Sequence, residues 1–193
     1  FDGFRTSHEI QKIQIWDYND LKPLVDMEAV KAFRTRALNP DTPVERGSAQ
    51  NPDVYFQNRE ASNPFYNNIP DIVENYMNEI NKLAGTNYGL FNYYGAPDAT
   101  DIIVVMGSAA QVATSTVDYL NKLGRKVGFI NVHLFRPFAA DRLMKAIPET
   151  VKRITVLDRT KEPGAIAEPL CLDVQTAVAQ SGRNISVVGG RYG

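Results

Sequence analysis

The sequence predicts an α/β fold for residues 88–193, arranged as a three-layer sandwich with a mostly parallel sheet. Two observations lead to this prediction. Short apolar runs of the kind that form buried parallel strands recur along this part of the chain. Helical segments of about 8–15 residues lie between them, so that strands and helices alternate. Such alternation builds right-handed βαβ units on one parallel sheet.

Each predicted element of this region has its own signal. The runs with the clearest strand character are DIIVVMGS, KVGFINVHLF, RITVLD and NISVVGG, and YGLFNYYG is a further strand candidate. The predicted helices between them cover Ala109–Leu123, Ala139–Ala146 and Ala167–Ala179. Gly124 ends the first of these helices, because glycine readily adopts the left-handed conformation that closes a helix.

The preceding residues predict an irregular and partly helical segment. The most regular pattern in the chain lies here, since apolar residues recur at +3 and +4 from Ile69 to Ala84. Asn68 is the predicted cap of this helix, Pro70 fits its first turn and Gly85 ends it. Before it we expect, in order, a strand at Ile10–Trp16, a helix at Met27–Leu38 and a proline-rich connection at Asn39–Asp53.

Composition excludes several classes of function. The formal net charge of the 193 residues is -1, so the chain lacks the basic excess that nucleic-acid and membrane surfaces require. Cys171 is the single cysteine, and one thiol cannot form an internal disulfide, a four-cysteine zinc site or the ligand set of an iron–sulfur cluster. We therefore expect no metal site in this chain and a reducing, cytoplasmic setting.

Candidate ligand-binding residues follow two of the predicted strands, at the edge where open α/β sheets usually bind ligands. Gly107 and Ser108 place backbone donors at a helix N-terminus, where an anion can bind. Arg136 follows the next strand and can face a phosphate or a carboxylate. Each has a structural alternative: Ser108 as a simple helix cap, and Arg136 as an anchor of its own loop. His133 is expected to be a partly buried histidine with its hydrogen bonds satisfied.

The segment VLDRTKEPGA concentrates charge at the end of another strand. It contains Asp158, Arg159, Lys161 and Glu162 within five positions. No histidine, thiol or activated serine lies nearby in sequence to complete a nucleophilic site. We expect an ion-paired loop that holds the fold or meets another domain, because fixed charges at an interface give specificity.

The segment DGFRTSHE is a second dense polar turn. Arg5, Thr6, Ser7, His8 and Glu9 are its candidates for contact with a charged ligand or a neighbouring domain. A proton-transfer role for His8 is chemically open, since the pKa of a free histidine lies near neutrality. No residue of the chain is assigned a catalytic role.

Seven segments occur in order and together cover nearly the whole chain: FDGFRTSHE, RGSAQNPDVYFQNREA, FNYYGAPDA, VVMGSA, LFRPF, VLDRTKEPGA and VVGGRYG. As an ordered set they resemble pyruvate:ferredoxin (flavodoxin) oxidoreductases. The resemblance implies that residues 1–16 end the pyrimidine-binding first domain, that residues 17–87 connect it with helices, and that residues 88–193 form a domain similar to the C-terminal domain of transketolases.

The resemblance also implies what the parent enzyme contains. It would decarboxylate pyruvate on thiamine diphosphate and magnesium, pass electrons through iron–sulfur clusters to ferredoxin or flavodoxin, make acetyl-CoA and form a homodimer. The G-D-G…N-N segment of the diphosphate site and the cysteine clusters are not found in this sequence. The chain is therefore expected to be an excised, non-catalytic scaffold domain that holds no cofactor itself, with its Arg5–Glu9 stretch toward the active-site side.

Two other interpretations remain open at this point. The chain can be a self-contained domain that binds CoA or a nucleotide phosphate at Ser108 and Arg136. It can also be the C-terminal domain of a transketolase-like enzyme from another branch.

Overall fold

The computed structural model describes all residues except 1–6, 11, 44–46 and 48. The chain divides into two compact units, a helical unit at Gln11–Thr86 and an α/β unit that contains Asn87–Gly193. Of the helices that the structure describes, none has the length and apolarity needed to span a bilayer.

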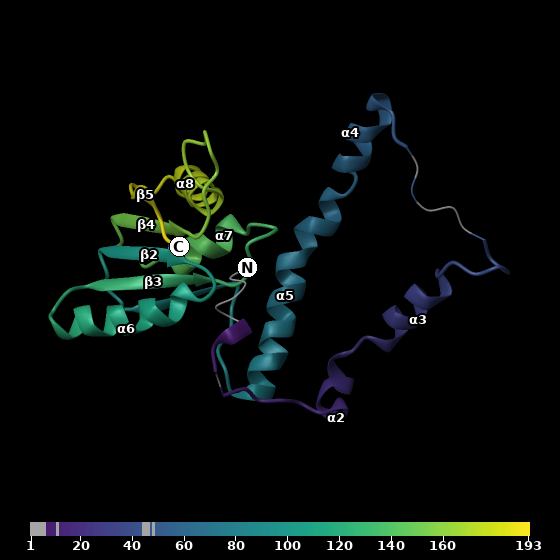
Figure 1. The fold of residues 1–193 in the computed structure, drawn as a ribbon, viewed down its shortest axis with the longest axis horizontal. Coiled ribbons are helices and arrows are strands. Elements are labelled where there is room, and N and C mark those ends of the chain that lie inside the picture. The colour runs from purple at the N-terminus through teal and green to yellow at the C-terminus, as the bar shows by residue number, and fades with distance from the viewer. Residues whose placement is uncertain (1–6, 11, 44–46, 48) are drawn as a thin grey trace. The chain divides into compact units, whose positions relative to one another are not determined.

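The α/β unit contains a five-stranded sheet in the order β1-β3-β2-β4-β5 (Figure 1). Strands β3, β2, β4 and β5 are parallel, whereas β1 pairs antiparallel with β3 at one edge. The prediction of a mostly parallel sheet is therefore confirmed. The strands are β1 (Phe91–Gly95), β2 (Asp101–Val105), β3 (Val127–Val132), β4 (Arg153–Asp158) and β5 (Ser186–Arg191).

Helices cover both faces of this sheet, as the three-layer prediction requires (Figure 1). On one face, α6 packs over β3 and β1, and its Ala113 and Val117 lie against Val105 and Phe129. The alternate strand positions, such as Ile154, point to the opposite face, where α8 packs on β4 and β5. The three helices are α6 (Ala109–Lys122), α7 (Ala140–Ala146) and α8 (Pro169–Ser181).

Connectivity explains why the helices separate in this way. The β2–α6–β3 connection runs toward the β1 edge, whereas β3–α7–β4 and β4–α8–β5 run toward the β5 edge. Right-handed crossovers that run in opposite directions place their helices on opposite faces. Of the helices that the structure describes in this unit, α6 is consequently the one on its face, and it does not cover the part formed by β4 and β5.

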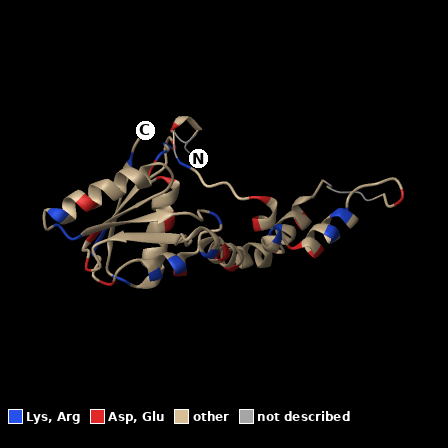
Figure 2. Cartoon of the chain, turned by 90° about the horizontal axis from the view of Figure 1, so that it is seen from below, with Lys and Arg blue, Asp and Glu red and all other residues tan. Residues whose placement is uncertain are grey.

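The helical unit has two amphipathic helices, α3 and α5, and none of its described helices contains a buried residue. Figure 2 shows basic and acidic residues interspersed along its helices. Its elements are α2 (Tyr18–Leu21), the 3-10 helix η1 (Lys22–Leu24), α3 (Met27–Thr35), α4 (Pro52–Glu60) and α5 (Asn63–Ala84).

Two predictions for this unit are wrong. Residues 12–16 form no strand, and the chain there has no regular structure. Helix α5 begins at Asn63 and not after Asn68, so that Pro64 occupies its first turn and Pro70 lies inside it. A proline at the start of a helix and one within it give the same local sequence signal, and the earlier proline is the true start. Gly85 ends the helix with a φ of 67°, as expected.

Candidate functional site

The carboxyl edge of the parallel strands carries a groove with a volume of about 400 Å³. Its floor is apolar and contains Ile103 and Val105 of β2 and Leu157 of β4. Helix α6 forms one wall with Val112, which is 68% exposed. Beyond Leu157, Val188 of β5 is on the same face and 54% exposed. The groove therefore continues into an uncovered apolar part of the sheet.

Two of the predicted residues meet at the mouth of this groove. Ser108 lies where β2 leads into α6, and Arg159 lies directly after β4. Ser108 occupies the cap position of α6, but its side chain makes no capping hydrogen bond. Gly107 before it has a φ of 76°, which turns the chain from strand into helix. Tyr192 closes the same end, and its backbone N–H donates to the Asp158 carbonyl at 3.1 Å.

Asp158 is buried and serves the fold, which is the structural one of the two roles expected for this loop. Its side chain is 1% exposed and accepts hydrogen bonds from the backbone N–H groups of Leu170 at 3.0 Å and Cys171 at 3.1 Å. These are donors of the first turn of α8, and Glu168 at the cap position makes no side-chain capping bond. Burial raises the pKa of Asp158 above its ordinary value, and the two backbone hydrogen bonds oppose that rise. Asp158 thus caps α8 from the end of β4.

Glu168 holds the other charges of the loop together. Its carboxylate is 3% exposed, receives a hydrogen bond from the Arg191 guanidinium, and lies 3.8 Å from the Lys161 ammonium. The backbone N–H of Glu162 donates to it at 2.8 Å. The hydrogen bond from Arg191 is the main cause that holds the pKa of Glu168 below its ordinary value. The predicted ion-paired loop is present, but its central acid lies outside the VLDRTKEPGA segment.

Replacing Glu168 by glutamine is expected to destabilise the chain in a pH-dependent way. A carboxyl whose folded-state pKa is lowered contributes stability above its unfolded pKa, and this contribution is lost as pH falls through the folded pKa. The variant should therefore unfold more easily than the parent near neutral pH, and the difference should shrink as the pH falls below the ordinary pKa of a glutamate. Urea unfolding across this range measures it.

Glu149→Gln is the matched control for this measurement. Its carboxylate lies 3.8 Å from Arg183 and is 90% exposed, so its loss should change little. An unfolding difference for Glu168→Gln that does not vary with pH would show that the ion pairs add no stability.

Arg136 lies in a different place from Ser108. Its guanidinium pairs with Asp173 of α8 at 2.5 Å, donates to the Phe135 carbonyl at 3.0 Å and stacks over the Phe135 ring. Helix α8 covers the face opposite to α6. The structural alternative for Arg136 is the one observed, and Ser108 and Arg136 do not form a joint anion site.

The polar turn near the N-terminus is only partly described. Arg5 and Thr6 lie outside the described residues, whereas Ser7, His8 and Glu9 are exposed. The Ser7 hydroxyl lies 2.7 Å from Nδ1 of His8. His133 is exposed and follows β3, with hydrogen-bond distances of 2.8 Å to the Gly89 carbonyl and to Asn131. Its hydrogen bonds are satisfied as expected, although its partial burial is not observed.

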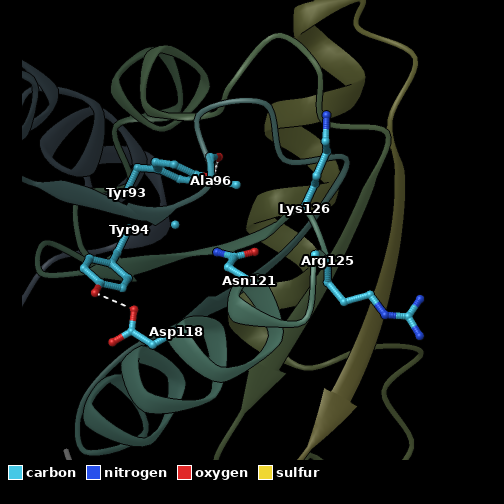
Figure 3. A pocket seen from close by; sticks show the side chains of 9 residues that line it. Tyr93, Tyr94, Ala96, Asp118, Asn121, Arg125 and Lys126 are labelled. Carbon is cyan, nitrogen blue, oxygen red and sulfur yellow. Dashed lines mark hydrogen bonds between the residues drawn. The ribbon is translucent and has the colours of Figure 1, made fainter.

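A second concavity, of about 650 Å³, lies at the opposite end of the parallel strands (Figure 3). Its polar groups mostly serve the fold. The Tyr94 hydroxyl donates to Asp118 at 2.7 Å, the Tyr93 hydroxyl to the Ala96 carbonyl, and the Asn121 side chain bonds Val127 in both directions. This arrangement indicates a structural surface hollow, in contrast to the groove at the carboxyl edge.

Comparison with known proteins shows what kind of protein has this architecture. A family model described as pyruvate flavodoxin/ferredoxin oxidoreductase, thiamine diphosphate-binding, matches residues 1–78. A second, described as pyruvate:ferredoxin oxidoreductase core domain II, matches residues 99–193. Both units of the chain thus correspond to parts of oxidoreductases of pyruvate. The chain belongs to the pyruvate:ferredoxin (flavodoxin) oxidoreductase family.

Individual relatives agree with this assignment. The pyruvate:ferredoxin oxidoreductase of Moorella thermoacetica is 58% identical over 193 residues, which are 100% of this chain and 16% of that protein. The pyruvate-flavodoxin oxidoreductase of Enterobacter agglomerans is 59% identical over 192 residues, again 16% of its length. A solved 2-oxoglutarate:ferredoxin oxidoreductase from Magnetococcus marinus has 16% identity and a TM-score of 0.40, over 78% of this chain and 23% of that one. The chain spans about one sixth of the length of these two curated relatives.

The acidic and thiol side chains that the structure describes form no metal site and mostly serve the fold. Among the described residues, no group of three or more histidine, cysteine, aspartate or glutamate side chains is placed to hold a metal ion. Two carboxylates are buried among the described residues. Asp158 accepts hydrogen bonds from backbone N–H groups, and Glu168 pairs with the Arg191 guanidinium. Cys171 is a single buried thiol. We therefore derive no catalytic step through thiamine diphosphate or an iron–sulfur cluster on these residues.

Proposed function

We propose that this chain is a non-catalytic scaffold region of a thiamine diphosphate-dependent pyruvate:ferredoxin oxidoreductase. The parent reaction converts pyruvate, CoA and oxidised ferredoxin to acetyl-CoA, carbon dioxide and reduced ferredoxin. One observation carries the proposal: at the carboxyl edge, where an α/β sheet usually places its chemistry, the buried acids serve the fold. Asp158 caps α8, and Glu168 joins Arg191 and Lys161.

The scaffold role implies particular partners. The chain packs against the other domains of its own enzyme, which acts as a homodimer in the cytoplasm, and ferredoxin or flavodoxin docks on other domains. The names of the relatives support the last point. A relative named pyruvate dehydrogenase [NADP(+)], from Cryptosporidium parvum, is 53% identical over the full length of this chain. Similar sequences thus occur in relatives named for three different acceptors, which favours acceptor choice elsewhere in the enzyme.

Calorimetric titration tests the proposal. The isolated 193-residue chain should give no saturable heat with thiamine diphosphate and magnesium, because none of its described acids belongs to a group of side chains placed to hold a metal ion. The full-length enzyme that contains the chain is the positive control and should bind the cofactor under the same conditions. Saturable binding by the isolated chain would falsify the scaffold proposal.

A further inference from the structure

Helix α5 carries a regular apolar pattern on one side. Six large apolar residues follow one another at alternating steps of three and four, which is a period of 3.5 residues. This pattern extends over most of the 22-residue helix. The six residues are Tyr66, Ile69, Val73, Tyr76, Ile80 and Leu83.

Apolar residues also flank this row on both sides. Phe65 and Ile72 lie on one side of the row, and Met77 and Ala84 lie on the other. The remaining face is rich in asparagine and charged residues. In a two-stranded coiled coil the flanking positions are usually charged, whereas a broad apolar face is typical of a helix packed against more than one neighbour. Glu79 interrupts the flank, and it already pairs with Lys82 on the same helix at 2.6 Å.

Much of this broad face is left exposed by the residues that the structure describes, and the rest of it is only half-buried. All residues of α5 are described, and none of them is buried. Phe65 is 75% exposed, Tyr66 and Ile72 are each 51% exposed, and Tyr76 is 45% exposed. Pro23 of η1 and Tyr76 line the same shallow hollow, so η1 lies near this part of α5. An apolar face of this extent marks an interaction surface.

We propose that the apolar face of α5 packs against the rest of the thiamine diphosphate-binding domain of the same polypeptide. The match to that domain's family model ends at residue 78, so it includes α5 from Asn63 through Asn78. The relatives are about six times longer than this chain, so a large part of such an enzyme lies outside these residues. The apolar flanks disfavour a second copy of α5 as the partner.

Photocrosslinking in the full-length enzyme tests this packing. Tyr66 and Tyr76 are each replaced by p-benzoylphenylalanine, a change from one aromatic side chain to another that the interface should tolerate. Asn67 and Asn78, on the polar side of α5 and exposed, receive the same residue as matched controls. Each variant is first checked for retained pyruvate oxidation, so that only correctly assembled enzyme is irradiated. Crosslinked peptides are then identified by mass spectrometry.

The expected result is that positions 66 and 76 link within one polypeptide to peptides of the thiamine diphosphate-binding domain, several-fold more than positions 67 and 78. Links that join two subunits, links to residues 87–193, or equal yields from all four positions would each overturn the inference. The inference rests on the proposed function, but the two fail separately. Cofactor binding by the isolated chain is read by calorimetry, and the partner of α5 is read by the crosslinks.

Discussion

Replacing Asp158 by alanine is expected to destabilise the chain by about 2–4 kcal/mol, because two buried N–H groups lose their acceptor. The donors are the backbone groups of Leu170 and Cys171 in the first turn of α8. Pro169 has no N–H, and the side chain of Glu168 at the cap position makes no capping hydrogen bond, so no local side chain replaces the lost acceptor. Denaturant unfolding at neutral pH measures the change.

Asp158→Asn is the informative comparison for this prediction. The amide oxygen of asparagine can still accept a hydrogen bond from one of the two N–H groups. The neutral amide also avoids the cost of burying a charged group, the same cost that raises the pKa of Asp158. We therefore expect a loss of about half that of the alanine variant. If asparagine and alanine were equally destabilising, the charge and not the hydrogen-bond geometry would hold α8.

Replacing Gly95 by alanine is expected to destabilise the α/β unit by about 3–5 kcal/mol, from overpacking and from backbone strain together. Gly95 has a φ of 138°, a backbone angle that residues with a side chain rarely adopt. It pairs with Gly128 between β1 and β3. A Cβ at Gly95 would meet the Gly128 Cα and would lie 2.6 Å from the Val127 carbonyl oxygen. Both obstacles are backbone atoms, so a side-chain rotation cannot relieve them.

Gly124→Ala is the control for the Gly95 variant. Gly124 also has a positive φ, of 79°, but a Cβ there would meet nothing within 4 Å. Its expected cost is about 1 kcal/mol, from the conformation alone. Comparing the unfolding midpoints of the two variants separates the cost of backbone strain, which both share, from the cost of the steric clash at Gly95. Equal losses would mean that the β1–β3 contact adjusts without cost.

The sequence predicts most of the α/β unit because its signals are local. Buried parallel strands are continuous apolar runs, and each helix between them has a clear end. The N-terminal unit is harder, because its helices bury no residue within the chain. Without burial, the apolar residues from Ile10 to Trp16 carry no strand information. Pro64 and Pro70 both fit a helix start, and only the coordinates distinguish them.

The sequence predicts part of the candidate site, because that part also depends on local signals. The carboxyl edge and its charged loop follow from the order of the elements, and the loop is ion-paired as expected. The roles of Asp158 and Glu168 depend on contacts that span 12 positions from Asp158 to Leu170 and 23 positions from Glu168 to Arg191. One feature of the sequence does indicate the capping role of Asp158. The Glu168–Pro169 start of α8 lacks a good local cap, which indicates a cap from elsewhere.

The diverging crossovers described above have a consequence for the groove. The chain leaves β2 toward the face of α6 and leaves the neighbouring β4 toward the face of α8. The loops after these two strands therefore part, and the sheet opens between them at a topological switch point. Ser108 and Arg159 stand on the two sides of that opening. The groove is a product of connectivity, so substitutions can change its lining and its charge but cannot close it while the strand order is kept.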